Sequence, residues 1–213
     1  MKDKKKIFIV GARWDGHPRV VADTIFNNND YEIAGFIDDN KNYHGKLNDG
    51  IPVLGGFEKL DFFKENNISD FIIATGDGPF RIECAHKLIR LGFKPVNIID
   101  NRSIVSRTSE LGVGLSICAN AVVAPGAVIK DYVLINHSAV IDHNVVLETG
   151  VTISPGVKIG GRAIVKEKTF IGIGSVILPD ITIGSGCIIG AGTVVIKNIS
   201  DNKKAVGNPA RFI

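Results

Sequence analysis

Two histidines, His137 and His143, are the side chains in this sequence that are best suited to transfer a proton. Each lies two places after an aliphatic residue, Ile135 or Ile141, in a pattern that repeats every six residues. The two rings therefore fall on successive faces of the structure that this repeat forms. Gly161 takes the place of His143 one coil further along, roughly 4.8 Å away. A histidine beside a bare backbone N–H suits a general base and an oxyanion donor. A surface histidine on a solvated loop fits the same residues, and the pattern leaves both interpretations open.

A second group of candidates follows strands predicted in the first hundred residues, where four strand ends carry glycine or polar residues: Gly16 and His17, Asp38 and Asp39, Gly55, and Thr75. In open parallel sheets, ligands bind outside the carboxyl ends of the strands. Pro18 near a helix start leaves the following N–H groups free to meet a phosphate. The loop is neither a P-loop nor a clean dinucleotide fingerprint. With the acidic pair it favours a nucleotide of unspecified base, although a plain strand-to-helix turn fits the loop equally well.

The element that must position His143 has a period of six. Every sixth residue from Val105 to Val195 is aliphatic, and a small or β-branched residue usually follows four positions later. This period fits neither an α-helix nor an alternating strand, but it fits a parallel β-helix in which each hexad makes one short strand and one corner. At about 18 residues per coil, the array predicts roughly five coils. We expect the tail after Ile199 to pack along the last coil.

Residues 1–100 have a different pattern, in which strands alternate with helices. We predict strands at 6–10, 31–37, 51–54, 70–74 and 95–99, and helices at 19–27, 59–66 and 81–91. This alternation predicts a Rossmann-like α/β domain with a small parallel sheet covered by helices. The expected domains are therefore 1–100, which binds the nucleotide, and 101–213, the β-helix. We expect the first domain to cover the open sheet edge at one end of the second.

The composition argues against several classes of function. The chain has 213 residues, 45% of them hydrophobic and 22% charged, as in an ordinary globular protein. A formal net charge of +3 is too small to argue for a nucleic-acid partner. The apolar run 7–10 is too short for a signal peptide or a membrane span, and the three cysteines lack metal-ligand spacing. We therefore expect a cytoplasmic protein with reduced thiols, no membrane contact and no bound metal.

Several of these motifs together resemble a known family. The hexad array that ends in Gly190-Ala-Gly-Thr-Val-Val195, with the tail Val206-Gly-Asn-Pro-Ala-Arg211, resembles the left-handed β-helix acyltransferases. The loop 11–21, Phe36-Ile-Asp-Asp39 and Val140-Ile-Asp-His143 narrow the resemblance over nearly the whole chain. The branch contains nucleotide-sugar N-acetyltransferases of the bacillosamine-pathway type and sialic acid O-acetyltransferase-like proteins. The resemblance implies an acetyl-CoA-dependent enzyme of bacterial surface glycan synthesis, and a homotrimer with active sites between subunits.

The resemblance also implies roles for individual residues. The acceptor would be the amino group of a nucleotide-linked amino-deoxy sugar, such as a 4-amino-4,6-dideoxy sugar. His143 matches the catalytic base, and Gly161 matches the amide that faces the thioester carbonyl. The remaining matches are His17, Asp38 and Asp39 at the nucleotide, Asn136 at the sugar, and the backbone of Ile173 and Ala191 along the coenzyme A arm.

Three departures separate this chain from the family pattern. Arg13, Trp14 and Asp15 lengthen the family's Gly-x-Gly-His-Gly loop, which leaves the nucleotide unspecified. Asn144 replaces the acidic residue that usually follows the base, and an amide cannot stabilise an imidazolium as a carboxylate does. His137 replaces Thr or Ser, either beside the sugar or as a space-filling residue.

With Asn144 after it, the base is either weaker or assisted by Asp142 or by a neighbouring subunit. A hydroxyl is a weaker nucleophile than an amine and needs the base more, so Asn144 slightly favours an amine acceptor and we expect N-acetylation. The alternatives are O-acetylation of a sugar hydroxyl, transfer of a longer acyl group, and a non-catalytic sugar-nucleotide binder.

Overall fold

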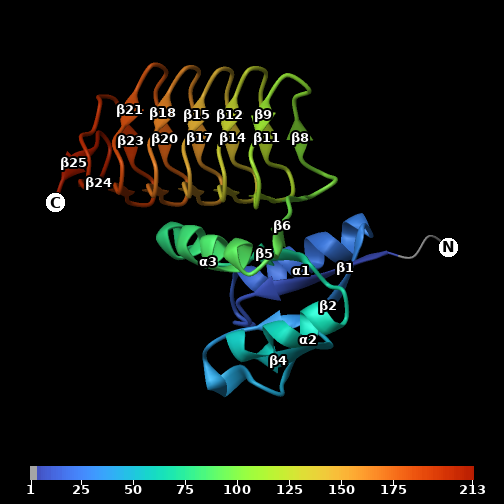
Figure 1. Ribbon diagram of the computed structural model, residues 1–213. Coiled ribbons are helices and arrows are strands. Elements are labelled where there is room, and N and C mark those ends of the chain that lie inside the picture. The colour runs from blue at the N-terminus through green and yellow to red at the C-terminus, as the bar shows by residue number, and fades with distance from the viewer. Residues whose placement is uncertain (1–3) are drawn as a thin grey trace.

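The N-terminal part of the chain forms an α/β domain around one sheet (Figure 1). A computed structural model describes residues 4–213. The strand order is β3-β4-β2-β1-β5-β6, and every neighbouring pair is parallel except β3 with β4. The elements are β1 (Lys5–Val10), α1 (His17–Asn28), β2 (Tyr31–Ile37), β3 (Leu47–Asn48), β4 (Ile51–Gly55), α2 (Leu60–Glu65), β5 (Asp70–Ile73), α3 (Gly78–Arg90) and β6 (Lys94–Pro95).

The central strand β1 is apolar at successive positions because both faces of the sheet are covered. Ile7 and Ile9 pack in one buried cluster with the apolar side of α1, whereas Phe8 and Val10 pack in another with α3. A strand buried on both faces loses the alternation of polar and apolar residues that a half-exposed strand keeps. The Rossmann-like domain expected from the alternating pattern is therefore confirmed, with β3 as an added antiparallel edge strand.

The rest of the chain is a parallel β-helix whose coils build three sheets. The first face has β7 (Ile98–Ile99), β10 (Ser116–Ile117), β13 (Leu134–Ile135), β16 (Thr152–Ile153), β19 (Phe170–Ile171), β22 (Ile188–Ile189), β24 (Lys204–Val206) and β25 (Arg211–Phe212). The second face has β8 (Ile104–Val105), β11 (Val122–Val123), β14 (Val140–Ile141), β17 (Lys158–Ile159), β20 (Val176–Ile177) and β23 (Val194–Val195). The third face has β9 (Glu110–Leu111), β12 (Val128–Ile129), β15 (Val146–Leu147), β18 (Ile164–Val165) and β21 (Thr182–Ile183).

The hexad register predicted from the sequence is confirmed strand by strand. Ile117 pairs with Ile135 and Ile135 with Ile153, each one coil further along, and all of these side chains are buried in the core of the prism. The tail closes the last coil, because β24 adds to the first face in parallel and β25 then turns back antiparallel to it. The chain thus covers the final sheet edge with its own C-terminal hairpin.

The boundary between the domains falls earlier than expected. The single strand predicted at 95–99 is two strands: β6 pairs with β5 in the first domain, whereas β7 pairs with β10 in the β-helix. Asn97, between them, bonds to the Gly112 carbonyl and the Leu115 amide of the first coil. The β-helix therefore begins at Ile98 rather than after residue 100, because the change of partner occurs at Asn97.

The α/β domain lies along the first face of the β-helix and does not cap its end, contrary to expectation (Figure 1). Each two-residue strand directs one side chain outward, and on β10, β13 and β16 these are Ser116, Leu134 and Thr152, all buried under the domain. Further along the same row, Phe170 and Ile188 are 38% and 44% exposed. The domain thus covers the N-terminal half of this face, where Ser116 lies beside His17 and Thr152 accepts a hydrogen bond from Arg81.

Candidate functional site

A pocket of about 530 Å³ opens at the carboxyl ends of β1, β2 and β5. Its walls include Gly16, His17, Asp38, Asp39 and Thr75, five of the residues that strand-end reasoning selected. Aromatic side chains that the sequence did not single out, Tyr43, Phe57 and Phe80, complete the lining. Flat aromatic rings beside carboxylates and backbone amides suit a ligand with a planar base and polar substituents.

The two aspartates after β2, Asp38 and Asp39, differ in how many hydrogen bonds their carboxylates accept from the protein. Asp38 accepts hydrogen bonds from the Ala12 and Asn40 amides, both at 2.8 Å, so its carboxylate holds the loop after β1 against the loop after β2. Asp39 accepts only the Phe57 amide, at 3.3 Å, among the residues that the structure describes. Asp39 therefore keeps more acceptor capacity for a ligand, and Asp38 shapes the pocket.

Gly55 lies outside the pocket lining, unlike the other strand-end candidates. It is buried, and its carbonyl accepts the Asp38 amide at 2.8 Å. Its φ of +152° and the close approach of the Glu58 and Lys59 side chains explain the glycine. Gly55 thus supports the acidic pair from behind.

His17 joins the pocket to the β-helix. Its Nε2 lies 3.2 Å from the Ser116 hydroxyl on β10. Burial, with the nearby charges of Arg81 and His137, lowers the pKa of His17 to about 3. At neutral pH its ring is therefore uncharged, and it contributes hydrogen bonding rather than charge to the site.

Arg81 is a buried residue that sequence reasoning missed. It is 3% exposed, and its guanidinium donates to the carbonyls of Thr75, Tyr132, Gly150 and Val151 and to the Thr152 hydroxyl. That hydroxyl donates in turn to the Gly76 carbonyl at 3.0 Å. These bonds tie the pocket wall at Thr75 and Gly76 to two successive coils of the β-helix.

A signal for Arg81 was present in the sequence of α3. The buried stripe of this helix is Arg81, Cys84, Ala85 and Leu88, at helical spacing. An arginine in register with an apolar stripe either packs its aliphatic carbons against the core and keeps its guanidinium in water, or donates hydrogen bonds to buried carbonyls. Here it is the second, and burial lowers its pKa to about 10.

His143 and Gly161 meet at the corner between the second and third faces, as the offset of one coil predicted. The imidazole lies over Gly161, so closely that a Cβ there would overlap its Nε2. Among the described residues, the Gly161 amide has no hydrogen-bond acceptor, whereas the next amide, that of Arg162, donates to the His143 carbonyl at 3.0 Å. A bare backbone and an unengaged N–H thus lie beside an exposed imidazole.

Asn144 has a backbone reason for its identity. Its φ is +58°, and its side chain lies over Gly126, the equivalent residue one coil earlier. The equivalent residues one and two coils later, Arg162 and Asp180, have the same left-handed backbone and form an ion pair at 2.7 Å. Asparagine tolerates this conformation better than most residues. The amide is therefore directed along the column, away from the His143 ring.

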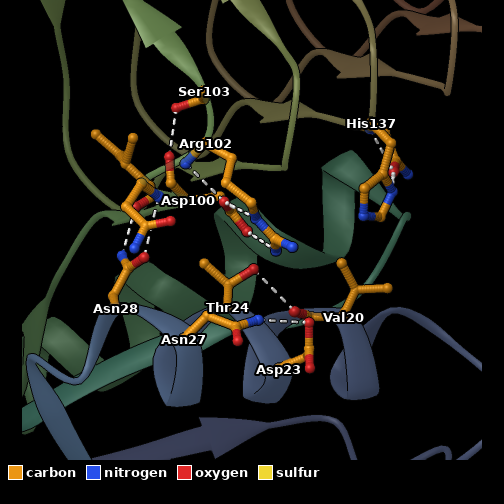
Figure 2. Close-up of polar contacts among 12 residues, drawn as sticks. Val20, Asp23, Thr24, Asn27, Asn28, Asp100, Arg102, Ser103 and His137 are labelled. Atoms are coloured by element: carbon orange, nitrogen blue, oxygen red, sulfur yellow. Dashed lines mark hydrogen bonds and ion pairs between the residues drawn. The ribbon is translucent and has the colours of Figure 1, made fainter.

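Asn136 and His137 lie at a different corner, between the first and second faces, next to the α/β domain. His137 Nδ1 lies 2.8 Å from Asn136 Oδ1, and Figure 2 shows the ring above α1, near the Asp100–Arg102 pair. Ile173 and Ala191 follow in the column of His137, two and three coils further along, and both are exposed. This corner therefore carries the candidate sugar contacts and the candidate coenzyme A backbone positions.

The structure keeps the two halves of the candidate site apart within one chain. The pocket belongs to the domain on the first face, and His143 lies at the one corner that does not border that face. The expectation that His137 and His143 are not neighbours in one subunit agrees with their places on successive corners.

The other chemically distinctive residues are dispersed or buried. Within residues 4–213, no group of three or more His, Cys, Asp or Glu side chains could hold a metal ion. The cysteines Cys84, Cys118 and Cys187 are all buried and unpaired, and burial raises the pKa of the first two to about 12. None of the helices in this range has the length and apolar character needed to span a bilayer.

Two families match separate parts of the chain. The family described as the PglD N-terminal domain matches residues 6–88, and the bacterial transferase hexapeptide family (six repeats) matches residues 162–197. Among curated relatives, the dTDP-3-amino-3,6-dideoxy-alpha-D-galactopyranose 3-N-acetyltransferase of Aneurinibacillus thermoaerophilus is 48% identical over 52 residues, 24% of this chain and 27% of that one. The matches span only 11–31% of the curated relatives' own lengths.

Solved structures match over the whole chain. The acetyltransferase domain of PglB from Neisseria gonorrhoeae is 34% identical with a TM-score of 0.91, covering 99% of this chain and 100% of that one. A histidine-to-alanine mutant of GDP-perosamine N-acetyltransferase from Caulobacter crescentus, in complex with CoA and GDP-perosamine, is 29% identical with a TM-score of 0.93, covering 100% and 98%. The chain therefore belongs to the hexapeptide-repeat, left-handed β-helix sugar acetyltransferases, in the branch that contains the PglB acetyltransferase domain.

Proposed function

We propose that this protein transfers the acetyl group of acetyl-CoA to the amine of a nucleotide-linked amino-deoxy sugar, such as a 4-amino-4,6-dideoxy sugar used for surface glycans. The observation that carries the proposal is the exposed imidazole of His143 over the bare backbone of Gly161. The pocket beside Asp39 and His17 supports the nucleotide. The likeness to an N-acetyltransferase bound to CoA and GDP-perosamine supports the pairing of donor and acceptor.

The chemistry needs one base and one oxyanion donor. The amine nitrogen forms a bond to the thioester carbon while His143 takes its proton. The Gly161 N–H donates to the oxygen of the tetrahedral intermediate, and the intermediate collapses as the carbon–sulfur bond breaks. The thiolate of coenzyme A is a stable leaving group, so no strong general acid is required. A positioned base contributes about 10²–10⁴ in rate.

The separation of the pocket from His143 supports a site shared between subunits. His143 is at the corner that does not border the face covered by the α/β domain, which supports a pocket supplied to it by another copy of the chain. Ile173 and Ala191 lie on the column of His137, at another corner, and would hold coenzyme A against the histidine of a neighbour. We propose a homotrimer, in which three such grooves close symmetrically. The cytoplasmic location expected from the sequence stays a prediction.

The test is acetyl transfer with UDP-, dTDP- and GDP-linked amino sugars, followed by release of free thiol. The wild type should acetylate at least one of them, and His143→Ala should lower turnover about 10²–10⁴-fold while leaving nucleotide-sugar binding within about twofold. Near-full activity of that variant would disprove the role of the base.

The same assay separates the alternatives. If mass spectrometry of the product locates the acetyl group on a hydroxyl, the acceptor is an alcohol and the protein is an O-acetyltransferase. Binding of nucleotide sugars without thiol release from any of them would leave a non-catalytic binding protein. Sedimentation velocity gives the number of subunits, and a monomer with full activity would contradict the shared site.

A further inference from the structure

The nucleotide pocket has an unusual balance of charge for an anionic ligand. Three carboxylates line it, those of Asp38, Asp39 and Asp77, and His17 contributes no charge because of its lowered pKa. Arg13 is the one cationic side chain among the described residues that line the pocket. Arg81 lies behind the wall with its donors directed to carbonyl and hydroxyl oxygens. A diphosphate entering this pocket thus has one guanidinium within it.

Arg13 is held near the pocket without being committed to it. Its Nε and Nη2 donate to the Asp15 carboxylate at 2.6 and 3.2 Å, and the two side chains are 67% and 60% exposed. Trp14, between them, packs edge-on against Tyr43 at 5.9 Å, and Tyr43 also lines the pocket. An exposed ion pair contributes little to stability, so the guanidinium can leave Asp15 at small cost.

We propose that Arg13 binds the diphosphate of the nucleotide sugar, and that Asp15 holds its guanidinium in place while the pocket is empty. The inference rests on the proposed function for its ligand. A planar guanidinium pairs with two phosphate oxygens at once, as it now pairs with the two oxygens of Asp15. Arg13, Trp14 and Asp15 are the residues that lengthen the loop, so the insertion supplies the cation and the carboxylate that keeps it ordered.

The chain supplies a matched control in Arg19. This residue is also exposed, and it makes the same two-pronged pair with Asp49, at 2.7 and 3.0 Å, but it does not line the pocket. Arg13→Ala and Arg19→Ala therefore remove the same charge and break the same kind of pair. Any difference in diphosphate affinity between the two variants therefore reflects the place of Arg13 in the pocket.

The experiment is calorimetric titration of the full-length protein with UDP, dTDP and GDP and with the matching nucleosides. For the diphosphate that the wild type binds, Arg13→Ala should lower affinity about 10–100-fold, the range for hydrogen bonds to a charged group. Arg19→Ala should stay within about threefold. The nucleoside should bind both variants like the wild type. Asp15→Asn, which releases Arg13, should bind the diphosphate as well as the wild type or slightly better.

The outcomes separate the inference from the proposed function. Diphosphate affinity within about threefold of wild type in Arg13→Ala would overturn the role of Arg13 while leaving acetyl transfer untouched. Equal losses in both arginine variants would also overturn it, because a general charge effect would then explain the result. If Arg13→Ala loses diphosphate affinity but the wild type acetylates no amino sugar, the role of Arg13 stands and the proposed reaction is rejected. A wild type that binds no nucleoside diphosphate would reject both.

Discussion

The α/β domain and the β-helix create functional sites in opposite ways. In the first, unlike loops converge at one sheet edge because parallel strands all end there, and the pocket forms wherever those loops are polar. In the second, each coil repeats the last, so a regular column of residues has no distinct chemistry. His143 stands in a column with Pro125, Gly161 and Pro179, and the chemistry arises where the repeat is broken. Converging loops form the pocket, whereas one exception to the repeat, His143, forms the proposed reaction centre.

The largest expected effect comes from separating the two regions. Arg81→Leu leaves carbonyls of both domains without their donor, and we expect a loss of about 3 kcal/mol or more in the free energy of unfolding. Because all of the lost bonds except that to Thr75 cross between the domains, the α/β domain should unfold before the β-helix, giving two calorimetric transitions. Scanning calorimetry of Arg90→Leu, on the exposed side of the same helix, is the control. A single, unshifted transition in Arg81→Leu would contradict the assigned role.

A second substitution tests the contact between His143 and Gly161. Gly161→Ala adds a Cβ where the imidazole of His143 now lies, so the ring must move. We expect turnover to fall about 10²-fold, the lower end for loss of a positioned base, with little change in nucleotide-sugar binding. In a His143→Ala background, the same substitution should have almost no further effect. Steady-state kinetics of the two single variants and the double variant measure this, and fully additive losses would show that Gly161 acts independently of the ring.

The effect that is smallest at neutral pH concerns the contact of His17 with the β-helix, and it grows as the pH falls. The folded pKa of His17, about 3, is lower than the ordinary 6.5. The unfolded chain therefore binds the proton first, and stability falls as the pH drops from 6.5 towards 3, by at most about 1.4 kcal/mol per pH unit for this group. His17→Gln should flatten that part of the curve in urea unfolding at several pH values. An unchanged slope would mean that His17 titrates normally in the folded protein.

The sequence predicted the regular parts of the fold better than the relation between them. A period of six fixes three faces and the register of every strand, because an aliphatic residue out of step would face water. The placement of the α/β domain depends on Ser116, Leu134 and Thr152, which are outward residues of mixed character. Nothing periodic distinguishes them from Phe170 and Ile188 in the same row, so the sequence did not reveal which face is covered.

The sequence predicted those candidate residues whose place in a repeat or at a strand end is enough to bring them to the site. The offset of one coil was enough to bring Gly161 beneath His143, and strand ends were enough to select Asp39 and Thr75. Roles that depend on distant partners were not predictable. Asp38 bonds across two loops, and Arg81 reaches carbonyls that carry no side-chain signal in the sequence.

The bonds of Arg81 have a consequence for how this protein can change in length. The carbonyls of Tyr132 and Gly150 are one coil apart, and the segment between them carries Asn136, His137 and His143. One guanidinium therefore sets the register of this coil against the α/β domain of its own chain. A coil duplicated between this segment and Ala191 would move the coenzyme A positions by about 4.8 Å relative to the histidine. A coil added beyond Ala191 would move none of them, so the C-terminal end is a place where this prism can lengthen without disturbing the proposed site.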